Sequence, residues 1–444
     1  MNIEELQLIV RQEMKQREEE GCSVEALRVE YEEIIGSQEA EKEARLEDLL
    51  GRVEALESPG MYMEPSTWAE IRAERPEGPR WIENVFSYGE LFDRIHGAWL
   101  GRCAGCLLGK PVEGASKAEI RIAGELSTGY PLGNYFGAIV NPPETIARRN
   151  WSPSNTSLLE GMDGMPRDDD TDYTIVGLRV LETAGLNFTT MDVANYWLTQ
   201  LPFYKVYTAE RIAYRNLVDG RRPPETATYR NPAREWIGAQ IRADAFGYVC
   251  PGRPEKAAEL AFRDAALSHV KNGIYGEQMV AAMIAAAFVT QDVEEIVDMG
   301  LSEIPAKSRL AEAVDQVRAW VKEDGDWERT ADRVAEMYGR LQGCHTITNA
   351  AIVALGVLYG ELDFERSITT AVMAGFDTDC NGATVGSIVG AAVGAQALPA
   401  KWVEPLKDTI HSSIVEMPVG RISDLARRTV AVAQRVLKSG KKGV

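Results

Sequence analysis

The sequence has few of the residues that build the commonest metal and disulfide sites. Of its 444 residues only four are histidine and six are cysteine. The histidines (His96, His269, His345 and His411) lie far apart and show no HExxH spacing, which argues against a histidine-based zinc site. Six cysteines over this length do not form a disulfide framework, so a reducing cytoplasm is the simplest location.

Positive charge is also scarce. The chain has 48 Lys and Arg against 67 Asp and Glu, a net charge of -19, which argues against nucleic acid as a partner. The uncharged stretch 383–400 is too rich in Gly, Ala, Ser and Thr for a membrane span. The N-terminus is densely charged and lacks the order of a signal peptide. We therefore expect neither nucleic acid nor a membrane to be a partner.

Proline is absent from residues 1–58, which carry apolar residues at helical spacing, as in Val24, Leu27, Tyr31 and Ile34. This pattern predicts a charged helical arm that is dispensable for activity. The alternative is self-association through a coiled coil, although three short stretches fall below the three to four heptads that this requires. Residues 59–85 contain several prolines and predict a linker along the surface, and residues 86–440 form the main region.

The main region is predicted to be helical throughout. Segments such as 277–290 and 346–360 place apolar residues at i, i+3, i+4 and i+7, and no series of alternating strands is visible. The fold class is therefore all-α, a compact bundle of many helices with an N-terminal helical extension. Within it, glycines recur every fourth residue at 97, 101, 105 and 109, so that one helix face admits another backbone. Cys103 and Cys106 on this helix are better explained as small buried residues than as a redox pair.

Two acidic clusters carry the chemistry. Asp168, Asp169, Asp170 and Asp172 precede one helical run, and Asp377 and Asp379 precede another. One or two carboxylates would suffice to cap a helix, so these clusters favour a site for Mg²⁺ or Mn²⁺, ions that prefer oxygen ligands. Capping and surface charge remain the alternative. If the fold joins the clusters, they would hold two ions about 3.5–4 Å apart.

Five motifs in series resemble the ADP-ribosylglycohydrolase family, the group of dinitrogenase-reductase-activating glycohydrolase and the ADP-ribosyl-acceptor hydrolases. The resemblance extends over roughly residues 90–435, with these motifs in the family's order. In chain order they are GAWLGRCAGCLLGKPVE (97–113), DDDTDYTIVGLRVLE (168–182), IGAQIRADAFGY (237–248), Leu267-Ser268-His269 and AGFDTDCNGATVGSIVGAAVGAQALPAKW (374–402). The resemblance implies an all-α fold, a centre of two Mg²⁺ ions with Mn²⁺ as the alternative, and residues 86–440 as the catalytic domain.

The resemblance also assigns roles to individual residues. The implied metal ligands are Asp168, Asp169, Asp170, Asp377, Asp379 and Cys380. The implied catalytic residues are Glu113, Asp169 and Asp170, of which any one would take a proton from the attacking water or assist the leaving group. The implied substrate-binding residues are Gly238, Ala239, Gln240, Arg242 and His269, with the diphosphate on the Gly-rich loop. A structural salt bridge for Arg242 and a core position for His269 are the alternatives.

Two positions depart from the family pattern. Asp168 stands in place of a metal-binding threonine and adds negative charge, and Cys380 stands in place of a threonine or serine. Sulfur is a poor magnesium ligand, so one ion is held by fewer protein groups or Asn381 compensates.

The implied activity is hydrolysis of the bond between ADP-ribose and an acceptor carried by a protein or a small molecule. An arginine-type N-glycoside is the default substrate. The alternatives are hydrolysis of another ribosyl compound and a non-catalytic, ADP-ribose-binding member.

Overall fold

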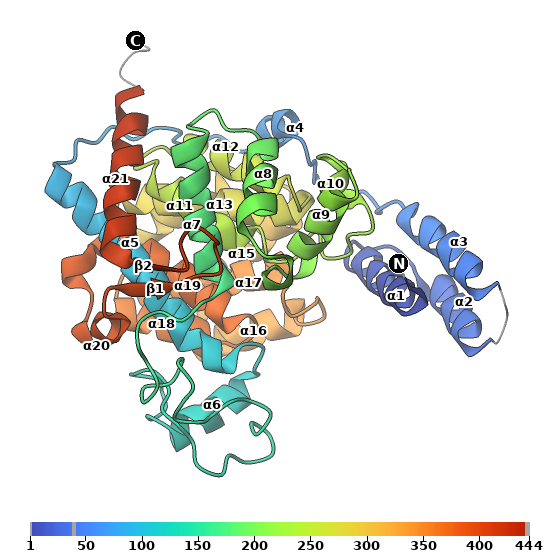
Figure 1. Ribbon diagram of the computed structural model, residues 1–444, viewed down its shortest axis with the longest axis horizontal. Helices are drawn as coiled ribbons and strands as arrows, with labels where there is room; N and C mark the ends of the chain where they lie inside the picture. Colours follow the sequence, from blue (N-terminus) through green and yellow to red (C-terminus); the bar gives the residue numbers. More distant parts are fainter. Residues whose placement is uncertain (1, 38–40, 440–444) are drawn as a thin grey trace.

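A computed structural model describes residues 2–37 and 41–439, and in these ranges the chain forms 21 α-helices and one two-stranded sheet (Figure 1). The first half comprises α1 (Ile3–Glu19), α2 (Glu25–Gly36), α3 (Lys42–Glu54), α4 (Trp68–Glu74), α5 (Tyr88–Gly109), α6 (Lys117–Leu126), α7 (Asp169–Thr183), α8 (Thr190–Gln200), α9 (Thr208–Val218) and α10 (Glu225–Thr228). The second half comprises α11 (Asp244–Tyr248), α12 (Pro254–Ala265), α13 (Lys271–Ala287), α14 (Val293–Leu301), α15 (Arg309–Asp324), α16 (Trp327–Tyr338), α17 (Thr346–Gly360), α18 (Phe364–Met373), α19 (Thr378–Val393), α20 (Ala400–Val403) and α21 (Ile422–Ser439).

The predicted all-α bundle with an N-terminal helical extension is thus confirmed. The two short strands, β1 (Thr409–His411) and β2 (Val419–Arg421), pair antiparallel with Ile410 opposite Gly420 and lead the chain into α21. None of the described helices has the length and apolar character needed to cross a membrane. Residues 1 and 38–40 of the predicted arm, and residue 440 at the end of the predicted main region, lie outside the described residues.

The glycine row of α5 packs directly on α19. Gly97, Gly101 and Gly105 lie against Gly390, Gly386 and Gly382, in that order, so the two helices run antiparallel with their backbones in contact. A Cβ at Gly105 would overlap the backbone carbonyl oxygen of Gly382. The close approach expected from the four-residue spacing is therefore present. It brings the last turn of α5 to the first turn of α19.

The arm formed by α1, α2 and α3 projects from one side of the body (Figure 1). These helices share a hydrophobic cluster of their own, separate from the main core. Its buried residues are Leu6, Ile9, Val10, Met14, Tyr31, Ile34, Leu46, Leu49, Leu50 and Val53. The apolar spacing of the sequence therefore marks the side chains that join the three helices to one another.

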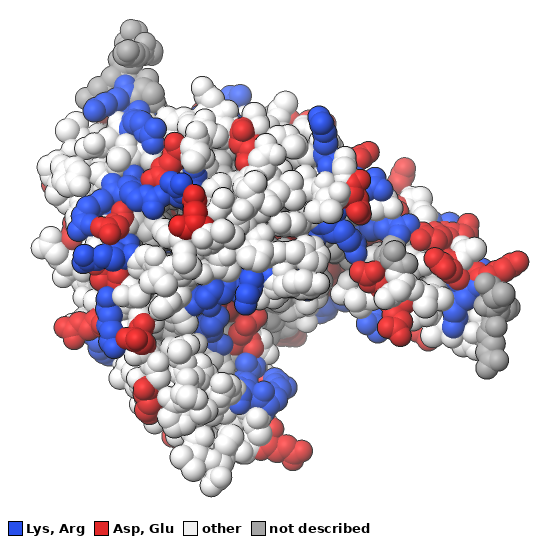
Figure 2. Space-filling model, viewed as in Figure 1, with Lys and Arg blue, Asp and Glu red and all other residues white. Residues whose placement is uncertain are grey.

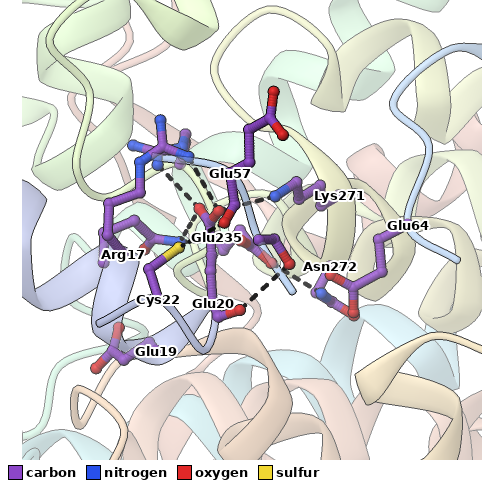
Figure 3. A network of polar contacts seen from close by, with 12 residues as sticks. Arg17, Glu19, Glu20, Cys22, Glu57, Glu64, Glu235, Lys271 and Asn272 are labelled. Atoms are coloured by element: carbon purple, nitrogen blue, oxygen red, sulfur yellow. Dashed lines mark hydrogen bonds and ion pairs between the residues drawn. The ribbon is translucent and has the colours of Figure 1, made fainter. Parts of the chain in front are cut away.

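The arm is attached to the body by buried charges on α1. Glu13 accepts two hydrogen bonds from Arg234 at 2.7 and 2.9 Å, and Glu20 pairs with both Arg234 and Lys271 at 2.9 Å. Gln16 donates to Glu235 at 2.9 Å. Figure 3 shows part of this network. Removing the arm would strip partners from buried charges of the body, which argues against the expectation that residues 1–58 are dispensable.

The predicted linker contains a helix and is bound to the body along its length. Thr67 caps α4, whose Ile71 is buried. Farther along, Arg75 and Arg80 both pair with the buried carboxylate of Glu303.

On the face shown in Figure 2, Lys and Arg are mixed with Asp and Glu across the body.

We predict that Gly105→Ala destabilises the protein by roughly 1–3 kcal/mol or more, because the methyl group would overlap a backbone atom that is itself held in a helix. Gly89→Ala, on the same helix, is the control. An added Cβ there has no neighbour within 4 Å, so the free energy of unfolding should stay unchanged or rise by up to about 1 kcal/mol. Equal denaturation midpoints for the two variants would contradict the proposed constraint.

We predict that Arg234→Ala loosens the arm, since the buried carboxylates of Glu13 and Glu20 lose the partner that they share on the body and keep only Arg17 of the arm as a shared partner. Amide hydrogen exchange in α1–α3 should accelerate by about 10²-fold, as expected when a buried ion pair is broken. Arg28→Ala is the control, because that half-exposed side chain pairs with Glu18 within the arm. Exchange rates that are the same in both variants would show that this network does not hold the arm.

Candidate metal centre

The first acidic cluster forms the N-terminus of α7. Asp168 is the N-cap, and its carboxylate accepts the backbone N–H of Asp170 at 3.0 Å. Lys110, just beyond α5, forms an ion pair with the other oxygen of Asp168. Burial raises the pKa of Asp168, but the Lys110 ammonium, the Asp170 N–H and Arg167 together keep that pKa below its usual value. Asp168 therefore stays charged and points toward the end of α5.

The second cluster forms the N-terminus of α19. Asp377 is the N-cap and Asp379 lies in the first turn, and both are 5% exposed. Thr378 between them donates its hydroxyl to the carbonyl oxygen of Gly109 at 2.8 Å. The Asp377 N–H donates to the side chain of Asn349 at 3.2 Å. The end of α5 is thus fixed to the start of α19.

The two clusters meet although about two hundred residues separate them. The Cys380 thiol donates to Asp170 at 3.3 Å. The ligand atoms of Cys106, Asp168 and Asp170 lie within 4.8 Å of one another, and so do those of Asp377, Asp379 and Cys380. Asp169 points more outward, with its side chain 31% exposed and 3.8 Å from Arg167. Both halves of the predicted metal site are thus in one place.

A buried arginine, which the sequence analysis did not single out, supports this arrangement. Arg102 on α5 is fully buried, donates twice to the backbone oxygen of Asp170 at 3.0 and 2.7 Å, and pairs with Asp244 at 2.8 Å. It also donates to the carbonyl oxygen of Ile241 at 2.6 Å. The sequence could have pointed to Arg102 in one way: it is a charged residue that lies between Gly101 and Cys103, on the glycine-rich part of the helix.

The electrostatics of the centre suit divalent cations. Burial, followed by the nearby carboxylates, raises the pKa of Asp170 and of Asp379 well above the usual value. One oxygen of Asp377 and one of Asp379 are buried and have no hydrogen-bond donor among the residues that the structure describes. Unpaired buried carboxylate oxygens are costly, and a bound cation would satisfy them. The carboxylates present therefore fit a divalent cation, as the acidic motifs predict.

Glu113 lies next to this centre. It lines a cavity of about 650 Å³ together with Ser116, Cys344, Phe376 and Asp377. Burial, then the charges of Asp377 and Asp168, raise the pKa of Glu113 to about 7. A carboxyl with this pKa exchanges protons near neutral pH, as a general base or acid requires.

The predicted phosphate loop is linked to the centre through Arg102. Gly238, Ala239, Gln240 and Arg242 are all buried. Arg242 pairs with Asp264 and Glu210, and an added Cβ at Gly238 would overlap the Glu210 carboxylate. Arg242 is therefore neutralised by carboxylates, as in the salt-bridge alternative. His269 lines a different cavity from Glu113, one of about 670 Å³ that it shares with Glu13, Arg17 and Glu20. Its ring Nδ1 is hydrogen-bonded to the Ser268 hydroxyl at 2.8 Å.

The chain is similar to known proteins in sequence and in fold. The chain is 25% identical over 325 residues to an uncharacterized protein of Archaeoglobus fulgidus, a match that covers 71% of this chain and 92% of the relative. Its fold is similar to a solved ADP-ribosylglycohydrolase-related protein complex, with a TM-score of 0.50 and 21% identity over 78% of this chain and 99% of the other. This structural likeness concerns the fold alone.

The sequence model of the ADP-ribosylglycohydrolase family matches residues 87–438, which include both acidic helix starts and Glu113. The family consists of metal-dependent, glycosidase-like hydrolases that act on ADP-ribosylated substrates. With most of its length covered, the chain belongs to the ADP-ribosylglycohydrolase family.

Proposed function

We propose that this protein hydrolyses the glycosidic bond between C1 of ADP-ribose and an acceptor, at a centre that binds two divalent ions. Mg²⁺ is the expected ion and Mn²⁺ the alternative, and residues 86–440 are the proposed catalytic region. The convergence of the α7 and α19 N-termini beside Glu113 is the observation that supports this proposal. An arginine-type N-glycoside is the first substrate to test.

Asp168, Asp170, Asp377 and Asp379 are the proposed ligands, with Asp169 at the outer edge and Cys380 between the two halves. Divalent ions bound there would neutralise the carboxylates and orient the sugar hydroxyls. Arg102 fixes Asp170 and Lys110 fixes Asp168, so the ligands are held before the ions arrive.

Glu113 is the proposed general base. In the reaction the oxygen of a water molecule bonds to C1, the bond from C1 to the acceptor breaks, and Glu113 passes the water's proton to the departing group. Asp169 is the second candidate because its side chain is partly exposed, whereas Asp170 is occupied by Arg102 and Cys380. The cavity beside Glu113 is the proposed entrance for the acceptor.

We predict that the protein with Mg²⁺ releases ADP-ribose from ADP-ribosylated arginine, and that Asp377→Asn lowers kcat/KM by about 10²-fold or more, because a buried ligand loses its charge. Chromatography of free ADP-ribose is the measurement, and Asp298→Asn on the surface of α14 is the control.

Serine-linked ADP-ribose and simple ribosides are tested in parallel. Release from a riboside alone would favour the alternative of another ribosyl substrate. ADP-ribose binding in calorimetry without hydrolysis of any substrate would contradict an enzymatic role.

We predict that Glu113→Gln lowers kcat about 10²–10⁴-fold with little change in KM. The carboxylate is the active form, so wild-type kcat should fall as the pH drops below the pKa of Glu113, about 7 without metal and lower with bound cations. The variant should show no such dependence, and Glu323→Gln on the surface should behave as wild type. A variant that keeps the wild-type pH profile would exclude Glu113 as the base.

A further inference from the structure

Each of the two ligand groups of the candidate metal centre contains one thiol, and a third thiol, Cys344, lies beside Asp377 in the adjoining cavity. Cys106, in the last full turn of α5, lies with Asp168 and Asp170, and Cys380, in the first turn of α19, lies with Asp377 and Asp379. Cys106 was explained from the sequence as a small packing residue. Its sulfur nevertheless lies within 4.8 Å of the carboxylate oxygens of both Asp168 and Asp170.

The two thiols approach the same carboxylate. Cys380 donates to Asp170 at 3.3 Å, and Cys106 lies within 4.8 Å of an oxygen of Asp170. The Asp170 carboxylate therefore has two sulfur atoms close to it, and they come from helices packed on each other. This site thus offers two sulfur donors close to one shared carboxylate.

Burial alone does not explain this placement. Cys103 lies one turn earlier on α5 and is as completely buried as Cys106, yet it belongs to neither ligand group. A second observation points to a ligand: the unpaired oxygens of Asp377 and Asp379 belong to side chains that are 95% buried. The centre therefore combines sulfur donors with oxygen donors that lack a partner.

Donor type determines which ion such a centre prefers. Mg²⁺ takes oxygen ligands almost exclusively, whereas Zn²⁺ and Co²⁺ accept thiolate together with carboxylate. A thiol that binds such an ion releases its proton to solvent, and the resulting thiolate strengthens the bond. Two thiols among four carboxylates thus favour an ion of the zinc class.

We propose that Cys106 and Cys380 make this centre a mixed oxygen–sulfur site that binds Zn²⁺ more tightly than Mg²⁺. The inference deepens the proposed function, because it concerns the ion of the same site, but it does not depend on hydrolysis. Zn²⁺ and Mg²⁺ compete for the carboxylates, so the ion present in the centre follows the supply of zinc.

The test is a titration of the chelator-treated, reduced full-length protein with Co²⁺ alone. Sulfur bound to Co²⁺ gives a charge-transfer absorption in the near ultraviolet, which is read without substrate. Cys106→Ser and Cys380→Ser should each weaken this band, and the double variant should lose it. Cys103→Ser is the matched control, on the same helix and equally buried, and should keep the full band.

Displacement of Co²⁺ by other ions measures the metal selectivity of the centre. Zn²⁺ should abolish the Co²⁺ band at near-stoichiometric concentration, whereas a large excess of Mg²⁺ should leave most of it. In the double variant Zn²⁺ should bind at least 10-fold more weakly, with Mg²⁺ affinity changed less than 3-fold. No band in the wild type, an unchanged band in the double variant, or equal displacement by Mg²⁺ and Zn²⁺ would each overturn the proposal.

Two further measurements separate this result from other failures. Circular dichroism and melting temperature establish that each variant is folded, and if Cys106→Ser unfolds, Cys380→Ser alone must still weaken the band for the proposal to stand. Mg²⁺-dependent ADP-ribose release is assayed on the same samples. A wild type that hydrolyses without a Co²⁺ band refutes the sulfur assignment alone, whereas a band without hydrolysis of any substrate refutes only the proposed function.

Discussion

The contact between the backbones of α5 and α19 positions everything else in the centre. A side chain larger than hydrogen at Gly101 or Gly105 would overlap the opposite helix, so the pair can approach this closely only along a row of glycines. Because the helices run antiparallel, the end of α5 meets the start of α19, where Thr378 donates to Gly109. Residues that follow α5 thereby come to lie beside the aspartates that begin α19. The same row of glycines therefore determines both how the two helices pack and where the metal ligands lie.

That placement concentrates more negative charge than the protein itself neutralises. Arg102 and Lys110 each pair with one aspartate of the α7 cluster, and both belong to α5 or the turn after it. Within residues 2–37 and 41–439 no Lys or Arg pairs with the aspartates of α19, and burial raises the pKa of Asp379 well above its usual value. A charge distribution of this kind is costly in an empty site, and divalent cations would remove the cost.

Local patterns in the sequence were sufficient for the helical class, the glycine face and the acidic helix starts, because each depends on spacing within one segment. They were insufficient for Arg102, whose partners lie on α7, in the loop before α11 and at the first residue of α11. They were also insufficient for the docking of α1, since Glu13 and Arg234 are 221 residues apart. For Arg242 the sequence pattern was visible but did not distinguish between two roles. Its motif suits a phosphate or a salt bridge equally, and only the surrounding carboxylates distinguish the two.

One segment of chain, 342–344, both contacts the arm and lines the cavity beside Glu113. The division of the sequence into arm, linker and main region does not predict this contact. Glu19 of α1 accepts the backbone N–H of Gln342 at 2.7 Å. Two residues later, the carbonyl oxygen of Cys344 accepts the N–H of Ile237, while Gln342 and Cys344 both line the cavity that reaches Asp377. A wall held on one side by α1 and on the other by the loop before α11 has little freedom to move. The arm therefore contributes to the shape of this cavity as well as to the stability of the body.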